Sequence, residues 1–513
     1  MNPESPRKAN RDWVPAAILT LIVLYGIALC IGWPQHATAL ITSPHSTQSH
    51  EAAPAPEAPP FWTVIPFVLL LAGIAILPLI GATSHWWESN LNRFKVAAGL
   101  ALLTVAYYAF LHHAELEGHW PAHHVVAPAE SGVQTAFVNT ILANAMLQEF
   151  VPFIVLLFTL YTITGGIRIS GDLQATPRTN ATFMAVGSVL ASFIGTTGAA
   201  MLLIRPLLET NRERKHVAHT IVIFIFIVCN CGGCLLPIGD PPLFLGYLEG
   251  VPFLWTLRLW PEWLFVNGLL LITYLALDGL WFHRRETKSD IERDTVRTHR
   301  LRFAGWQVNA PLLIGVVLAV ALLDPGKPFP GTDWHPWMYL REVVQLGFVA
   351  ISLWFGNREV RDANLFTYGA IIEVAALFVG IFICMQPALQ ILGSKGSELG
   401  LATPAHFFWA SGTLSSVLDN APTYLVFFKT AQSLPMDPQI TPVAGVDPRL
   451  LAAISLGSVF MGAMTYIGNG PNFMVRSIAE SSGVKMPSFF GYVAYSVLIL
   501  LPILALMVWL FLM

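Results

Sequence analysis

The chain has 513 residues, of which 55% are hydrophobic and only 12% are charged, about half the charged share of an average soluble domain. A soluble fold of this length could not bury so much apolar surface, whereas a bilayer can, because each spanning helix needs about 20 apolar residues. The formal net charge of -3 gives no basic footprint for nucleic acid. Composition therefore predicts a protein embedded in the lipid bilayer, without a nucleic-acid partner.

The first apolar segment, at about residues 14–33, allows two interpretations. Basic residues precede it, and the small residues around Ala37 could form a cleavage site. The segment is therefore either a cleaved signal peptide or a retained membrane helix. The stretch 47–60 is rich in Ala, Pro, Glu and Ser and predicts a flexible extracytoplasmic linker.

Further apolar stretches have the length and composition of spanning helices. They lie at about 62–81, 95–112, 148–168, 217–248, 258–282, 308–324, 341–356, 365–392, 450–475 and 487–512. Two more stretches, 180–210 and 403–430, are apolar but are interrupted by Gly, Thr, Asn or Pro, which favours re-entrant hairpins. We therefore predict an all-α polytopic membrane protein.

Lysine and arginine set the expected orientation, because cytoplasmic loops carry an excess of both. The loop 283–302 is strongly basic, so we expect it on the cytoplasmic side. Counting spans outward from this loop places Arg212 and Arg358 on the same side and the histidine-rich segment 112–124 on the other. This arrangement fits a multi-pass protein of the bacterial inner membrane.

Two parts of the chain resemble each other when they are compared at a fixed shift. A shift of 224 positions pairs Glu149 with Glu373, and after a longer loop a shift of 229 positions pairs Asp240 with Asn469. An odd number of predicted spans separates the two glutamates, so the two copies enter the membrane from opposite sides. We predict an inverted-topology repeat with two re-entrant hairpins and two unwound transmembrane helices, an architecture of secondary transporters.

The repeat divides the chain into scaffold and transport segments. The segments are 1–61 (hydrophobic segment and linker), 62–135 (scaffold helices), 136–283 (transport repeat 1), 284–303 (cytoplasmic basic loop), 304–362 (scaffold helices) and 363–513 (transport repeat 2). In transporters of this kind the substrate binds near the membrane midplane, where paired broken helices meet. We therefore expect the site between the two transport repeats.

Each repeat contains two interruptions that could bind an ion. One is a hairpin tip, at 195–198 in the first copy and 419–423 in the second; the other lies inside a long span, at 237–242 and 467–472. Pro and Gly unwind a helix there and free backbone groups, which is costly in hydrocarbon unless those groups line a cavity or bind a ligand. Carbonyl, hydroxyl and amide oxygens suit a small hard cation, and the N-termini of half-helices suit a carboxylate or oxyanion.

Asp240 and Asp419 are the two acids in these broken segments. An ionisable side chain at membrane depth is costly and is a functional hypothesis by default. Each Asp could exchange a proton for a cation, or it could simply cap a half-helix N-terminus and never titrate. Glu149 and Glu373 are second-tier candidates, because we expect them to open equivalent helices, where a negative charge is also favourable for structural reasons.

We expect no metal centre, no organic cofactor and no catalytic group. Cys229, Cys231 and Cys234 resemble a ligand cluster, but thiols inside an apolar span are ordinary small fillers. The histidine-rich segment is interpreted as a solvated loop. The sequence contains no P-loop and no hydrolase motif, so we predict a transporter and not an enzyme.

Two motifs resemble a known group of transporters. The segment Gly232-Gly233-Cys234-Leu235-Leu236-Pro237-Ile238-Gly239-Asp240 is similar to a signature of NhaD-type sodium/proton antiporters and of their citrate-transporter relatives. The segment 418–423 resembles the Asp-Asn-x-Pro hairpin of the same ion transporter superfamily. The resemblance covers about residues 60–513. It implies an inverted-repeat fold, a homodimer held by a scaffold domain and elevator-like alternating access.

The unwound segments and the resemblance together give the candidate ion- or substrate-binding residues. They are Thr196, Thr197, Asn230, Gly239, Asp240, Asp419, Asn420, Thr423, Gly468 and Asn469. The first hairpin has Gly-Thr-Thr-Gly where NhaD-type proteins have Asp-Asn, and neither hairpin has the Ser-Asn-Thr of dicarboxylate symporters.

Two functions therefore stay open. The first expectation is sodium/proton antiport, and the alternative is cation-coupled transport of citrate or another small anion. A membrane scaffold without transport would not explain two broken, symmetry-related segments.

Overall fold

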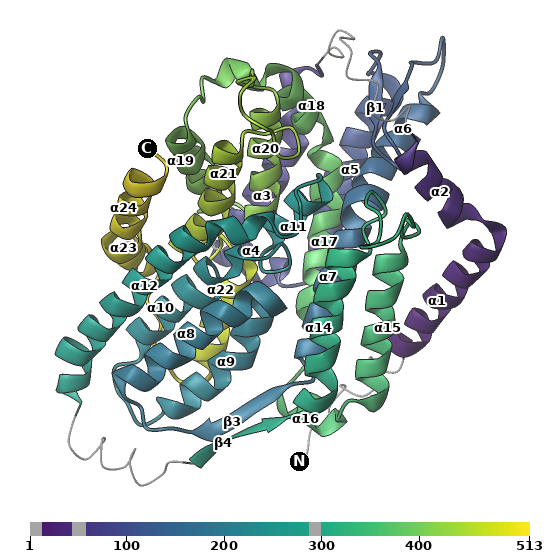
Figure 1. Ribbon diagram of the computed structural model, residues 1–513. Helices are drawn as coiled ribbons and strands as arrows, with labels where there is room; N and C mark the ends of the chain where they lie inside the picture. Colours follow the sequence, from purple (N-terminus) through teal and green to yellow (C-terminus); the bar gives the residue numbers. More distant parts are fainter. Residues whose placement is uncertain (1–12, 44–57, 79, 287–298) are drawn as a thin grey trace.

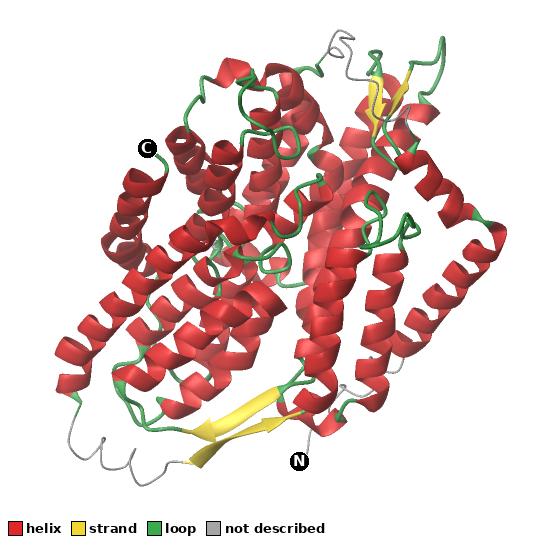
Figure 2. Ribbon diagram, in the orientation of Figure 1, coloured by secondary structure: helices red, strands yellow, loops and turns green. Residues whose placement is uncertain are grey.

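The computed structural model describes residues 13–43, 58–78, 80–286 and 299–513 of the chain. It is predominantly helical, as expected (Figures 1 and 2). Five of the described helices are long and apolar enough to cross a membrane, or seven if each of two bent helix pairs forms one span. This agrees with a multi-pass membrane protein.

The described residues also form two small antiparallel sheets, which were not predicted from the sequence (Figure 2). Strands β1 (Leu116–Gly118) and β2 (His124–Val126) pair within the histidine-rich segment, which was expected to be a loop. Strands β3 (Arg168–Asp172) and β4 (His299–Ala304) pair across a large sequence separation. β4 covers the end of the predicted basic loop, of which residues 287–298 lie outside the described residues.

The helices before the first hairpin include the predicted N-terminal segment. They are α1 (Trp13–Ile31), α2 (Trp33–Thr42), α3 (Ile65–Ile76), α4 (Gly81–Trp87), α5 (Asn90–Phe110), α6 (Thr135–Leu142) and α7 (Val151–Thr164). α1 packs against α15 (Leu340–Phe355), and the Tyr25 hydroxyl donates to the carbonyl oxygen of Met338 at 3.0 Å. The small-residue segment around Ala37 is helical and lies within α2.

One predicted helix boundary is wrong. The span expected at 148–168 begins at Thr135 and runs through a π-helical segment, Ala143–Phe150, into α7. The residues before position 148 are mostly apolar and contain neither Gly nor Pro, so nothing in them stops the helix. Glu149 therefore lies inside a helix and does not open one.

The two predicted hairpin stretches form helix pairs. The first pair is α8 (Pro177–Ile194) and α9 (Thr196–Thr210), and the second is α19 (Pro404–Ser415) and α20 (Asn420–Gln432). A Thr-Pro dipeptide starts both pairs: the hydroxyls of Thr176 and Thr403 accept the backbone N–H of the third residue that follows them. Proline at the first helical position costs no hydrogen bond there.

Two long helices are interrupted at the motifs rich in Pro and Gly. α10 (Ala218–Val228) ends before a 3₁₀ turn, Cys231–Cys234, and α11 (Pro241–Leu248) resumes the helix. α21 (Pro448–Phe460), a 3₁₀ turn at Met461–Met464 and α22 (Gly470–Ser481) follow the same order. We call α8–α11 and α19–α22 together the hairpin group.

The remaining helices surround this group. They are α12 (Trp260–Leu277), α14 (Trp306–Leu322), α15, α16 (Arg358–Ala363), α17 (Gly369–Cys384), α18 (Gln386–Lys395), α23 (Phe489–Tyr495) and α24 (Leu501–Phe511). α7 packs mainly on α14 and α15, and α17 packs on α5 (Figure 1). α10 is apolar on all sides from Ile221 onward and is buried from His219 to Val228, so it forms the centre of the hairpin group.

Candidate functional site

The carboxylate of Asp240 is the centre of a buried polar cluster. The side chain is 1% exposed and accepts three hydrogen bonds from other side chains. The Thr196 hydroxyl donates to Oδ1 at 2.9 Å and the Asn469 amide to the same oxygen at 3.1 Å. The Asn420 amide donates to Oδ2 at 2.6 Å. A buried carboxylate requires such partners, because an unpaired one would be very costly.

Four helix starts bring these residues together. Thr196 begins α9 and Asn420 begins α20, while Asp240 directly precedes α11 and Asn469 directly precedes α22. The N-terminus of a helix carries partial positive charge from its unpaired N–H groups. Four such ends lie around one carboxylate, and their partial positive charge favours an anion there.

The four residues are related by the two shifts found in the sequence. A shift of 224 positions relates Thr196 to Asn420, and a shift of 229 positions relates Asp240 to Asn469. The backbone joins two of the segments as well, since the Thr196 N–H donates to the Gly239 carbonyl oxygen at 2.8 Å. The predicted hairpin tips and unwound segments thus meet at Asp240.

A chain of asparagines supports the cluster from the side of the second interruption. Asn469 also donates to the Oδ1 of Asn230 at 3.2 Å, and Asn230 donates to the Oδ1 of Asn472 at 2.8 Å. Asn472 in turn donates to the carbonyl oxygens of Gly462 and Thr465. These side chains satisfy backbone groups that the interruption frees, which is required in hydrocarbon.

Asp419 does not join the cluster through a hydrogen bond. Its Oδ1 accepts the backbone N–H of Ala421 at 3.0 Å, so it caps α20, which is the structural alternative considered for both acids. Thr423 is buried and donates to the Asp419 carbonyl oxygen at 2.9 Å. Asp240, in contrast, occupies the N-cap position of α11 but makes no capping hydrogen bond.

Gly239 and Gly468 hold the unwound segments against the hairpins. A Cβ on Gly239 would overlap the carbonyl oxygen of Gly233, and a Cβ on Gly468 would lie 2.6 Å from the Gly462 carbonyl oxygen. A Gly468 Cβ would also lie 2.7 Å from the carbonyl oxygen of Ser415 in the second hairpin. Only glycine allows these backbones to approach so closely.

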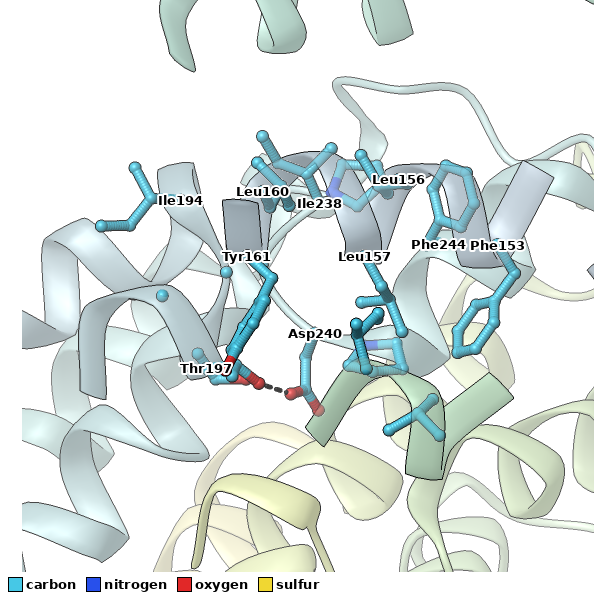
Figure 3. A pocket seen from close by; sticks show the side chains of 18 of the residues that line it. Phe153, Leu156, Leu157, Leu160, Tyr161, Ile194, Thr197, Ile238, Asp240 and Phe244 are labelled. Carbon is cyan, nitrogen blue, oxygen red and sulfur yellow. Dashed lines mark hydrogen bonds between the residues drawn. The ribbon is translucent and has the colours of Figure 1, made fainter. Parts of the chain in front are cut away.

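A small cavity of about 80 Å³ reaches the cluster between α7, α17 and the first hairpin. Figure 3 shows Asp240 and Thr197 at one side of it, with apolar side chains such as Leu156 and Ile238 around the rest. Asp240 is the one charged residue that lines this cavity among the described residues. The volume holds a small ion or a few waters and is below the range of about 300–1,000 Å³ for organic ligands.

The second-tier glutamates lie away from the cluster. Glu149 is 8% exposed, and its Oε1 accepts a long hydrogen bond of 3.4 Å from Gln386. Glu373 lies near the start of α17 and forms an ion pair of 2.8 Å with Arg93 of α5. Neither glutamate side chain therefore contributes a hydrogen bond to the cluster at Asp240.

Several polar residues that build the site were not among the predicted candidates. Asn472 is the last residue of the predicted interruption 467–472, and Ser192 lies in the predicted hairpin stretch 180–210, but neither was a candidate. The Ser192 hydroxyl donates to the Gly232 carbonyl oxygen at 2.6 Å and accepts the Leu235 N–H at 3.1 Å. Its match with Ser416 at the shift of 224 positions is the signal that could have identified Ser192.

Comparisons with known proteins agree with a transporter. A family model described as "Putative citrate transport" matches residues 57–512, nearly the whole chain. The P protein of Mus musculus is 25% identical over an alignment of 246 residues that covers 42% of this chain and 28% of that protein. The P protein of Sus scrofa is 24% identical over an alignment of the same length, which covers 42% of this chain and 27% of that protein. The matched part of the chain thus spans less than a third of the length of these curated relatives.

Proposed function

This chain belongs to the citrate transport family, and from that premise we propose that it is a secondary active transporter that exchanges sodium ions for protons at Asp240. The family match covers residues 57–512 and makes the chain a membrane transporter. The coupling ions, the exchange mechanism and the role of each residue are our proposal. It needs no organic cofactor, only the lipid bilayer and the transported ions.

The proposed architecture is an inverted-topology repeat with two re-entrant hairpins and two unwound helices. Its support is the matched order of elements: hairpin, interrupted helix, then the same again at shifts of 224 and 229 positions. In such transporters the two repeats move against each other around a site at the midplane. We propose the same for this chain, as a homodimer in the bacterial inner membrane.

The observation that carries the proposal is the Asp240 carboxylate at the meeting point of four helix starts. Carboxylate, hydroxyl, amide and carbonyl oxygens are hard ligands that suit a small hard cation. The Oδ1 of Asn420 is buried and accepts no hydrogen bond from the part of the chain that the structure describes, so one amide oxygen beside Asp240 is free to bind an ion. A proton and a sodium ion would then compete for the same carboxylate.

Transport of citrate, driven by a coupling cation, is the second candidate. The family description favours it, and so do the four helix N-termini, which suit a carboxylate. Against it, no basic side chain among the described residues lines the cavity at Asp240. A tricarboxylate ordinarily binds to arginine or lysine.

Sodium-gradient-driven proton flux in proteoliposomes tests the proposal. We expect flux in the wild-type protein and only background flux in Asp240→Asn, which keeps the shape of the side chain but loses its charge. Asp419→Asn is the matched control, because asparagine caps a helix as well as aspartate does, and it should keep most of the flux.

Uptake of labelled citrate separates the two candidates. The second candidate would be established by two results together: citrate uptake driven by a sodium or proton gradient, and no sodium/proton exchange when citrate is absent. Equal flux in Asp240→Asn and wild type would overturn both, because each uses Asp240 to hold a cation.

A further inference from the structure

A second, larger cavity lies at the end of the molecule that carries β3 and β4. Its volume is about 990 Å³, and it shares no residue with the cluster at Asp240. Its walls come from β3, the second half of α9, the connection to α10, Phe282 and the segment that follows α22. The distribution of Lys and Arg predicts that this end faces the cytoplasm.

The lining of this cavity is strongly basic. Its cationic residues are Arg168, Arg205, Arg212, Arg214, Lys215 and Lys485, and Glu209 is the one acidic residue among the described residues that line it. Arg214 is already neutralised, because it donates to the buried carboxylate of Asp278 at 2.9 Å. Arg168, Arg205, Arg212 and Lys485 form no ion pair with any described residue.

Arg205 is the least satisfied of these cations. Its Nε is buried and has no hydrogen-bond partner among the described residues, and the charge of Arg168 acts on it unfavourably. Two like charges held together at a partly buried place are costly unless an anion joins them. The two side chains come from different elements, α9 and β3, so the fold itself brings them together.

The chemistry of the cavity fits a phosphate group. A phosphate offers several strong acceptor oxygens and can accept hydrogen bonds from two guanidinium groups at once. The same cavity is also lined by Leu208, Phe282 and Val484, which are apolar. Basic pockets between membrane helices on the cytoplasmic side bind the head groups of anionic lipids.

We propose that this cavity is a phosphate-binding site centred on Arg168 and Arg205, filled by an anionic phospholipid head group or by a soluble phosphate. The proposal does not depend on which ion is transported. A bound phosphate joins β3 to α9 and so stabilises the hairpin group against the neighbouring strand.

The test measures the thermal unfolding of the purified full chain in nonionic detergent at constant ionic strength. Short-chain phosphatidylglycerol, inorganic phosphate and citrate are each titrated separately. We expect a saturable rise in Tm with phosphatidylglycerol or with phosphate. Arg205→Gln should weaken that binding about tenfold or more, because hydrogen bonds between charged groups are strong. Arg258→Gln, an exposed arginine outside the cavity, is the matched control and should bind as wild type.

Each outcome decides the proposal. A shift with phosphatidylglycerol alone identifies a lipid site, and a shift with phosphate alone identifies a soluble ligand; both support the proposal if Arg205→Gln loses the shift. Arg168→Gln is a second variant on another element, should Arg205→Gln fail to fold. Binding that both variants leave unchanged overturns the proposal, as does a shift with citrate alone.

Discussion

At the scale of single residues, the two aspartates in the broken segments show how surroundings decide a role. Asp419 accepts the backbone N–H of Ala421 and completes the start of α20. Asp240 occupies the same kind of position before α11 but accepts from three side chains of other segments instead. Asp240 therefore couples four parts of the chain, and any change at one of its partners should alter ion binding.

Thr196→Val should lower transport strongly. Valine has nearly the shape of threonine but cannot donate to Asp240, and a hydrogen bond to a charged group contributes about 1.5–3 kcal/mol. We therefore expect the apparent affinity for the coupling ion to fall about tenfold to a hundredfold. Thr196→Ser keeps the hydroxyl and should retain most of the activity.

Thr197→Val is the control for this prediction. Thr197 lines the same cavity but makes no hydrogen bond to Asp240. The initial rate of sodium-gradient-driven proton flux, measured over a range of sodium concentrations, compares the three variants. Equal losses in Thr196→Val and Thr197→Val would show that the Asp240 contact has no special role.

At the scale of elements, the interruptions could be predicted and their bonding could not. Local sequence predicts the two breaks, because Pro and Gly end a helix for local reasons. The segments are Asp240-Pro241-Pro242 and Asn469-Gly470-Pro471. The hydrogen bond between Asn420 and Asp240 joins residues 180 positions apart and depends on how the whole group packs. The helix through Glu149 starts earlier than expected for a local reason: Ser131-Gly132 mark a turn just before Thr135, and no Gly or Pro interrupts the chain between Thr135 and Glu149.

Gly239→Ala and Gly468→Ala should destabilise the hairpin group. Each added methyl group would meet backbone atoms that cannot rotate away, those of Gly233 for Gly239 and those of Gly462 for Gly468. Overpacking of this kind typically costs about 1–3 kcal/mol. Gly470→Ala is the matched control, because a Cβ there meets nothing within 4 Å.

The measurement is the Tm of each purified variant in detergent, together with the fraction that elutes as a single species. We expect a lower Tm for the first two variants and an unchanged Tm for Gly470→Ala. If Gly239→Ala unfolds at the wild-type temperature, Gly239 does not approach the backbone of Gly233 as closely as the structure indicates.

At the scale of the whole molecule, the cavity at Asp240 lies where the hairpin group meets its neighbours. α7 packs mainly on α14 and α15, yet it also contacts α9 of the first hairpin. If alternating access moves the hairpin group as a unit, α9 must slide along α7. The two helices lie close together at Thr164 of α7 and Gly198 of α9, because a Cβ on Gly198 would lie 3.1 Å from the Thr164 Oγ1.

A disulfide at this contact should therefore stop transport. In the double variant Thr164→Cys/Gly198→Cys a sulfur takes the place of the Thr164 hydroxyl next to the new Cβ, a separation that suits a disulfide. Cys30→Ser removes the exposed native thiol, while the other four cysteines are buried. We expect oxidation to abolish proton flux and reduction to restore it, with neither single variant affected. If the disulfide forms and the flux continues, α7 and α9 move together, and the moving unit must include α7.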